Sequence, residues 1–162
     1  MKNWHILSVY FLETCKIGTY NGNVMKVGAD SFCIISDSVQ EKPVDQLKTA
    51  CASLGATLLK PTSDEMNKAI VDALYNQAFY PNPFMAPALL DATDETKEGT
   101  WTDLGGNPLT YTNWAQNQPL VSSDQNYAVF DFYSFPVPGK WSTTGSSDTA
   151  YLVCQKKLTR KS

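Results

Sequence analysis

The chain has 162 residues, of which 43% are hydrophobic and 18% charged, and its formal net charge is −3. That length suits one domain with a real core, and the composition excludes a disordered or collagen-like chain. The last eight residues hold four of the 13 basic residues and no acidic one, which leaves 9 basic and 16 acidic residues elsewhere, a net charge of −7. An acidic body whose only arginine is Arg160, in this tail, excludes nucleic acid as the main ligand.

The first 40 residues are typical of strands and turns. The apolar run that ends at Leu12 predicts a first β-strand, with a signal peptide as the alternative. No stretch of the chain reaches the roughly 18 to 20 apolar residues of a membrane span, so none is expected. The pair Asn21–Gly22 predicts a hairpin turn, and Cys15 and Cys33 flank it, in positions where they could close the hairpin.

Four cysteines occur at wide spacing, at positions 15, 33, 51 and 154. An even number at such spacing predicts two disulfides and an oxidising, extracellular compartment. Four buried thiols are the alternative. No Cys-x-x-Cys pair or Cys/His cluster provides a ligand set for zinc.

Residues 43–77 predict two helices. Pro43 suits the opening turn of the first helix, and Gly55 ends it. The apolar residues on one face of this helix are Val44, Leu47, Cys51 and Leu54. The second helix opens at Thr62–Glu65 with a capping-box pattern and ends before the two prolines of residues 80–83. Its apolar stripe consists of Met66, Ala69, Ile70, Ala73 and Leu74.

From Ala88 onward the pattern predicts short strands and turns and no helix, with strands at residues 126–132 and 150–155. Residues 108–124 have no regular pattern and predict a long irregular loop, a kind of segment that usually carries function. The aromatic residues of 126–135 alternate between two faces of a strand. One face of this strand must lie in the core. For the other face, burial in the core is favoured over an exposed contact surface.

The sequence offers little for catalysis. His5 is the only histidine, and no glycine-rich phosphate loop occurs. Paired carboxylates for glycoside hydrolysis are available, but solvated acids on a turn are the favoured interpretation. These acids are Asp91, Asp94, Glu95, Glu98 and Asp103. We therefore expect a non-catalytic protein.

Five segments, in this order along the chain, resemble motifs of the C-type lectin-like domain. They are Cys51 to Leu58, Asp94 to Trp101, Pro108 to Trp114, Gly139 to Trp141 and Tyr151 to Cys154. The resemblance implies an α+β fold in which two helices pack on small antiparallel sheets beside a long irregular loop. It also implies a lectin-like domain over residues 30–157, with residues 1–29 as an N-terminal strand and hairpin extension and residues 158–162 as a basic tail. Trp114 and Trp141 match family positions near the hinge of the fold, which favours core packing for them over a role as ligand platforms.

The same resemblance implies the disulfide pairing. The first-helix cysteine pairs with the last-strand cysteine in this family, here Cys51 with Cys154, and Cys15 with Cys33 forms the additional pair of the long form. Closing the longer loop would contribute about 4 to 5 kcal/mol in the chain-entropy model. The family's inner pair is missing, because Tyr127 and about Ser146 stand at its positions.

Sugar-binding members hold calcium with long-loop oxygens, and Ca²⁺ needs 6 to 8 of them. The corresponding residues here are Gln118-Pro119-Leu120, Gln125 and Trp141-Ser142-Thr143, which bring no carboxylate. We therefore expect the sugar–calcium site to be lost and no cofactor to be bound. A residual structural calcium site at Asp94 and Glu98 is the alternative, although its loop partners would be Val121 and Asn126, with Asp124 as the nearby substitute.

Taken with the resemblance, these residues predict a secreted recognition module that binds a protein or a glycan without calcium. A calcium-dependent lectin with altered ligands and a structural subunit of an extracellular assembly, including a homo-oligomer, are the alternatives. The expected contact surface is the long loop with its neighbours. Its candidate ligand-binding residues are Gln116, Gln118, Asp124, Gln125, Asn126, Tyr133, Phe135 and Ser142.

Overall fold

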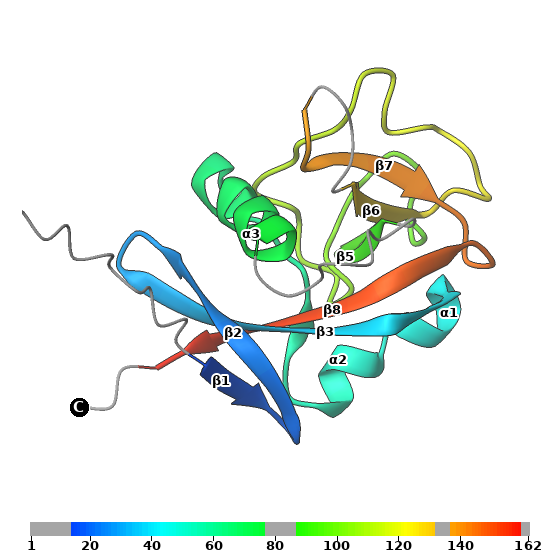
Figure 1. The fold of residues 1–162 in the computed structure, drawn as a ribbon. Coiled ribbons are helices and arrows are strands. Elements are labelled where there is room, and N and C mark those ends of the chain that lie inside the picture. Colours follow the sequence, from blue (N-terminus) through cyan, green and yellow to red (C-terminus); the bar gives the residue numbers. More distant parts are fainter. Residues whose placement is uncertain (1–13, 77–86, 132–136, 160–162) are drawn as a thin grey trace, which may run out of the picture.

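The computed structural model describes residues 14–76, 87–131 and 137–159 (Figure 1). Three helices lie in these segments: α1 (Val44–Leu47), α2 (Ala50–Ser53) and α3 (Asp64–Asn76). The strands are β1 (Thr14–Ile17), β2 (Tyr20–Val27), β3 (Asp30–Pro43), β4 (Thr57–Leu58), β5 (Ala88–Thr93), β6 (Tyr127–Asp131), β7 (Lys140–Thr144) and β8 (Thr149–Leu158). The α+β class predicted from the sequence is confirmed.

The long strand β8 joins the two halves of the sheet, whose order is β1-β2-β3-β8-β5-β6-β7, with β4 also paired to β8. Every pairing is antiparallel except that of β5 with β8, so the sheet is mixed. Figure 1 shows β3 and β8 crossing the middle of the molecule, with α3 on one side and α1 and α2 on the other. No helix among the described residues is long and apolar enough to cross a membrane.

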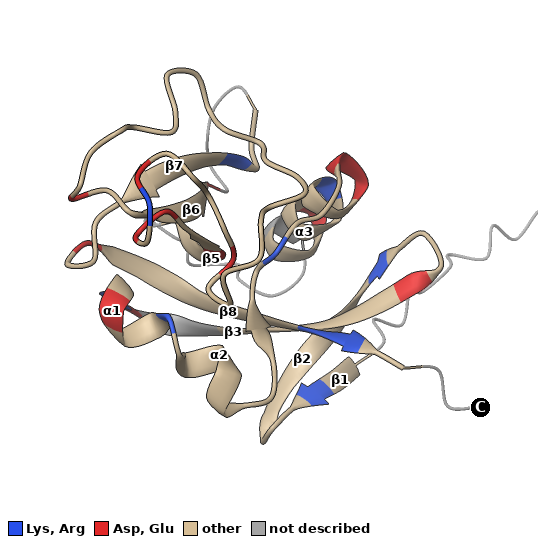
Figure 2. Cartoon of the chain, turned by 180° about the vertical axis from the view of Figure 1, so that it is seen from behind, with Lys and Arg blue, Asp and Glu red and all other residues tan. Residues whose placement is uncertain are grey.

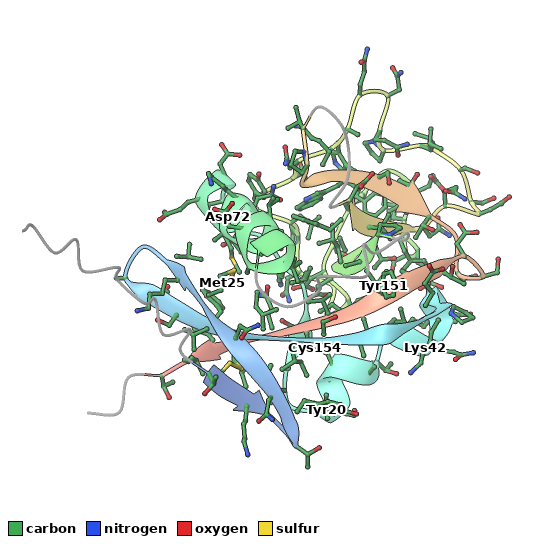
Figure 3. The ribbon with its side chains drawn as sticks, viewed as in Figure 1. Tyr20, Met25, Lys42, Asp72, Tyr151 and Cys154 are labelled. Atoms are coloured by element: carbon green, nitrogen blue, oxygen red, sulfur yellow. A yellow bond between two sulfur atoms is a disulfide. The ribbon has the colours of Figure 1, made fainter. Side chains whose placement is uncertain are left out.

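Two apolar cores fill the space on either side of this sheet. The first lies under α3 and contains the buried stripe Met66, Ile70 and Leu74 together with Met25 of β2, which points toward that helix (Figure 3). The second lies under α1 and α2 and contains Val44, Leu47, Cys51 and Leu58.

Strand β6 belongs to both cores, as the burial of both its faces shows. Ala128 and Phe130 pack in the first core, whereas Tyr127 and Val129 pack in the second. Burial was the favoured prediction for this strand, and it is confirmed for residues 127–130. The neighbouring Tyr133 and Phe135 lie outside the described residues.

The N-terminal hairpin turns earlier than the sequence predicts. Ile17 pairs with Tyr20, so the turn consists of Gly18 and Thr19, and Gly22 lies inside β2 opposite Cys15. Glycine at position 22 allows β2 and β3 to approach closely, because a Cβ there would lie 2.4 Å from the carbonyl oxygen of Ile34. The prediction of a turn at Asn21–Gly22 is therefore wrong.

The first predicted helix is two separate single turns, α1 and α2, with Lys48 and Thr49 in a turn between them. The second helix is confirmed as α3, but its capping differs from the prediction. Ser63 accepts the N-terminal hydrogen bond, from the backbone N–H of Met66 at 3.1 Å. Glu65 instead accepts a hydrogen bond from the backbone N–H of Gly28 at 2.9 Å, which ties α3 to the β2–β3 turn.

Both disulfides that the resemblance implied are present. Cys15 pairs with Cys33 across a Cα–Cα distance of 5.7 Å, and Cys51 pairs with Cys154 across 5.4 Å. The second bond attaches α2 to the middle of β8, where Cys154 is labelled in Figure 3. It therefore links the second core to the strand that both halves of the sheet share.

Candidate functional site

The connection from β5 to β6, residues 94–126, contains no regular strand, which confirms the predicted long irregular loop. Isolated bridges interrupt it, between Thr93 and Thr102, between Thr102 and Pro108 and between Trp114 and Trp141. The root of the loop is pinned to β7 by two backbone hydrogen bonds. Trp141 N–H donates to the carbonyl of Asn113 at 3.0 Å, and Ala115 N–H donates to the carbonyl of Trp141 at 2.8 Å.

Gly139, just before β7, joins this loop root to α3. Its carbonyl accepts hydrogen bonds from the side-chain amides of Asn67 at 3.0 Å and Asn113 at 2.9 Å. The Asn113 side chain also accepts a hydrogen bond from Lys140 Nζ at 2.7 Å. Gly139 has a φ of +85°, and a Cβ there would lie 2.6 Å from Cγ2 of Val71, so only glycine fits this junction.

Four aromatic side chains form a floor beneath the loop: Trp101, Tyr111, Trp114 and Trp141. Three edge-to-face contacts, with ring centroids 4.7 to 5.7 Å apart, connect them. Trp141 is only 2% exposed, and its indole N–H donates to Asn67 Oδ1 at 3.0 Å. Trp114 is half-buried and packs against the first core, so both tryptophans have the core position that the resemblance implied.

Gln118 lies over β7. Its side-chain oxygen accepts two hydrogen bonds from Thr143, one from the backbone N–H and one from the hydroxyl, each at 3.0 Å. The Gln118–Pro119 bond that follows is cis. Beyond it the loop exposes two apolar side chains, Leu120 at 45% and Val121 at 77%.

The end of the loop contacts the turn that follows β7. The Gln125 side chain hydrogen-bonds the Asp148 carboxylate, which also accepts from the N–H of Gly145 at 2.7 Å and the hydroxyl of Thr144 at 2.9 Å. These bonds, the one from Gly145 foremost, lower the pKa of Asp148. Asn126 Nδ2 donates to the carbonyl of Ser123 at 2.8 Å. This part of the loop is therefore folded against the protein.

The structure gathers some of the predicted site residues and separates others. Gln118 contacts Thr143 of β7, whereas the side chain of the preceding Ser142 lies on the opposite face of that strand. Gln125 reaches the turn at the end of the same strand. Gln116 and Asp124 are exposed on the loop. Tyr133 and Phe135 belong to residues 132–136, which the structure does not describe.

The acids predicted to be solvated are partly buried, so that interpretation is wrong for Asp91, Asp94 and Asp103. Asp94 is 2% exposed, and its Oδ2 accepts the N–H of Gly99 at 2.8 Å, while its buried Oδ1 has no partner. Glu98 is exposed on the same turn. In the described parts of the chain, no three His, Cys, Asp or Glu side chains are grouped to hold a metal.

The sequence did not reveal the polar network of Tyr127. This side chain is buried, yet its hydroxyl donates to Glu95 Oε2 at 2.8 Å and accepts from Lys48 Nζ at 3.2 Å. Lys48 in turn pairs with Asp45 at 2.9 Å. Burial raises the pKa of Tyr127, and the hydrogen bond to Asp45 raises that of Lys48, so the phenol stays neutral and the amine charged. The network links α1 to β6 and the acidic turn, at the position of one missing inner cysteine.

The comparisons agree with this architecture. Among solved structures, the mouse scavenger receptor C-type lectin carbohydrate-recognition domain has a TM-score of 0.64 at 19% identity, covering 81% of this chain and 92% of that one. Human lithostathine has a TM-score of 0.68 at 13% identity, covering 89% and 91%. Herring type II antifreeze protein has 0.63 at 16%, covering 79% and 92%. These similarities confirm the C-type lectin-like fold.

The family model for the lectin C-type domain matches residues 40–156, most of the chain. The match includes the long loop and the Cys51–Cys154 disulfide, and it leaves out β1 and β2. This protein therefore belongs to the C-type lectin domain family and is a non-catalytic binding module of it.

Proposed function

We propose that this domain recognises an extracellular protein or glycan through its long loop, without a calcium ion between protein and ligand. The observation that carries the proposal is the contact of Gln118 with Thr143, two positions that the family resemblance assigns to calcium ligands. The oxygen of Gln118 is already taken by two donors from Thr143. Such a contact replaces metal ligation by a direct link between loop and strand.

The charges and oxygens of the remaining positions support the same conclusion. Leu120 has no ligand oxygen, Ser142 and Thr143 have only hydroxyls, and Gln125 is engaged with Asp148. Because none of these positions supplies a carboxylate, they compensate the dehydration of a dication poorly. The loop therefore binds through what it exposes, which is the apolar pair Leu120 and Val121 among polar groups.

The residual structural calcium site does not fit the residues either. Asp94 offers one buried oxygen without a partner, but Val121, its loop counterpart, has no ligand oxygen and is 77% exposed. The Asn126 amide group donates to Ser123. Even with the carboxylate of Glu98, which is exposed on the same turn, these side chains fall short of the 6 to 8 oxygens that Ca²⁺ requires.

The names of the similar structures favour a search that covers more than sugars. One is described as a carbohydrate-recognition domain and another as an antifreeze protein, so related folds serve ligands of different chemistry. Two disulfides require an oxidising compartment, so we place the protein and its ligand outside the cell.

The test is a binding screen on a glycan array and on an array of extracellular proteins, each run once with calcium and once with EDTA. A calcium concentration of about 2 mM exceeds the dissociation constants of extracellular calcium modules, roughly 0.1 to 1 mM. We expect binding of equal strength in both buffers. Leu120→Asp with Val121→Asp should weaken it at least about tenfold, since a central apolar contact contributes 1 to 2 kcal/mol or more. Tyr20→Asp is the control for an added charge, because Tyr20 is exposed on β2, away from the long loop (Figure 3). Binding that requires calcium, or that survives the loop variant, would contradict the proposal.

A further inference from the structure

A cavity of about 440 Å³ lies between α2 and the turn at residues 103–105. Its walls include Lys60 and Asp91 as well as residues of α2 and β4. It shares no residue with the long-loop surface at 116–126, and it lies beside the Cys51 end of the main disulfide. The proposed loop function does not use it.

Three charged side chains meet at one wall of this cavity: Lys60, Asp91 and Asp103. Lys60 Nζ lies 2.5 Å from Asp103 Oδ2 and 3.8 Å from Asp91 Oδ2. Asp103 also accepts hydrogen bonds from the backbone N–H of Asn107 at 2.8 Å and from its side-chain amide. Burial opposes its ionisation, but these bonds outweigh burial and hold the pKa of Asp103 at about 2.

The negative charge of Asp91 has fewer hydrogen-bond partners than that of Asp103. It is only 9% exposed, and its Oδ1 accepts the backbone N–H of Leu104 at 2.8 Å. Among the described residues, no donor lies within hydrogen-bond distance of its Oδ2, because Lys60 stands 3.8 Å away. Asp91 Oδ2 is therefore not sealed off but reaches the cavity, where a donor group of a ligand can take the place of water.

The charge count leaves the wall negative. Two carboxylates share the single ammonium of Lys60, a net charge of −1. Lys48 also lines the cavity, but its ammonium is bound to Asp45 and to the hydroxyl of Tyr127. A further cation is therefore the complement of Asp91.

The other walls suit an aliphatic stem. They are built from small and apolar side chains of α2, β4 and the turn, namely Ala52, Ala56, Leu58 and Leu104. Long cationic side chains bury their methylene stems against such surfaces while the charged head finds a polar partner.

We propose that this cavity binds an ammonium or guanidinium group on an aliphatic stem, with Asp91 Oδ2 accepting its hydrogen bond, as a lysine or arginine side chain of a partner protein would present it. A free alkylamine has the same chemistry and is the other source of such a group. Burial raises the pKa of Asp91, in the presence of Lys60, Asp103 and Lys48, and a bound cation would oppose that shift.

The experiment is a titration of the whole ¹⁵N-labelled protein with n-butylammonium chloride, followed by amide chemical shifts at constant ionic strength. We expect saturable shifts at Leu104 and Gly105, with a Kd on the order of 1 to 10 mM for one ion pair and a short stem. Neutral n-butanol should leave the same amides unshifted. Linear shifts without saturation, or equal shifts with n-butanol, would overturn the proposal.

Two variants test the assignment to Asp91. Asp91→Asn keeps the acceptor for Leu104 and removes the charge, so it should weaken binding at least tenfold. Ala52→Leu narrows the cavity without altering a charge and should weaken it likewise. Asp72→Asn, at an exposed residue of α3 paired with Lys68, is the control and should bind as the parent does (Figure 2 shows the acidic and basic residues of α3 in red and blue). Undiminished binding in both Asp91→Asn and Ala52→Leu would reject the site.

Two further probes separate the sources of the cation. Nα-acetyl-lysine N-methylamide, a mimic of a side chain within a protein, should bind more tightly than n-butylammonium if the partner is a protein. Equal affinity would favour a free amine. The Nε-acetylated form of the same probe carries no charge and should not bind, and its binding would contradict recognition of a cation.

Discussion

The hydroxyl of Tyr127 donates a 2.8 Å hydrogen bond to Glu95, and so joins a buried position of β6 to the acidic turn 32 residues earlier in the chain. The same oxygen accepts a hydrogen bond from Lys48, which follows α1. One side chain thus connects three segments at a point where the family resemblance places half of a disulfide.

Tyr127→Phe should lower the free energy of unfolding by about 1 to 3 kcal/mol, because it removes two hydrogen bonds that involve charged groups while the ring stays packed. Urea unfolding followed by tryptophan fluorescence measures the change. Tyr20→Phe is the control, since Tyr20 is half-exposed and should change stability by less than about 0.5 kcal/mol. Equal effects of the two substitutions would show that the network contributes nothing.

The two disulfides should differ in their contribution to stability. Cys51 and Cys154 are 103 residues apart in sequence, whereas Cys15 and Cys33 are 18 apart. Chain entropy predicts that replacing the long-range pair by alanines costs about 1.5 kcal/mol more than replacing the short-range pair. Denaturant unfolding of the two double variants checks this, and a greater loss from the Cys15–Cys33 pair would contradict it.

Calcium should neither bind nor stabilise the protein at millimolar concentration, so the Tm in calcium and in EDTA should be the same. Leu120→Asn combined with Ser142→Asn and Thr143→Asp supplies the missing oxygens and should create calcium binding, measured by calorimetry. Ser142→Asn alone, which adds no carboxylate, is the control. Failure of the triple variant to bind would show that these positions do not correspond to the family's ligands.

Asp103 should stabilise the fold in a pH-dependent way. Its pKa of about 2 in the folded state lies below the usual 3.8, so the carboxylate stabilises the fold above pH 4, by roughly 2 kcal/mol. That contribution disappears as the pH falls from 4 toward 2. Asp103→Asn should therefore lose stability at pH 7 and differ little from the parent near pH 2, as urea unfolding at both values would show. A difference independent of pH would contradict the ion pair with Lys60.

Gly139→Ala should destabilise the protein far more than Gly106→Ala. Both glycines have a φ of +85°, so alanine at either position meets the same backbone penalty of about 1 to 2 kcal/mol. Around Gly106 no atom lies within 4 Å of an added Cβ, whereas at Gly139 the Val71 side chain lies 2.6 Å away. The difference between the two variants in the free energy of unfolding, measured in urea, gives the cost of the steric clash with Val71, which we expect to be about 1 to 3 kcal/mol. Equal losses would show that α3 moves aside freely.

Local patterns predicted the fold well where they were strong. The stripe from Met66 to Leu74 fixed α3, and ordered motifs over residues 51–154 indicated the lectin-like architecture with its long loop. The turn at Gly18 was missed because Asn21–Gly22 is the stronger hairpin signal. Gly22 instead lies within β2, where a residue distant in sequence, Ile34, passes too close for a side chain.

The candidate sites depended on contacts that no local pattern contains. Lys60 and Asp103 are 43 residues apart. The bridge between Leu59 and Leu90 of β5 places Lys60 beside Asp91, and the hydrogen bond from Leu104 N–H to Asp91 brings the neighbouring Asp103 to the same wall. A carboxylate in a turn has the same sequence signature whether it is solvated or buried beside a lysine. The pairing of Gln118 with Thr143 likewise depends on how the loop folds over β7.

The pinned root of the loop has a consequence for engineering. Asn113 and Ala115 are fixed to β7, and Gly139 holds the junction with α3. Residues 119–123 project beyond these anchors, and within that stretch only Ser123 makes a side-chain hydrogen bond. Randomising residues 119–122 should therefore yield libraries of new binders whose frame melts at nearly the temperature of the parent, so that this small disulfide-bonded domain can serve as a display scaffold.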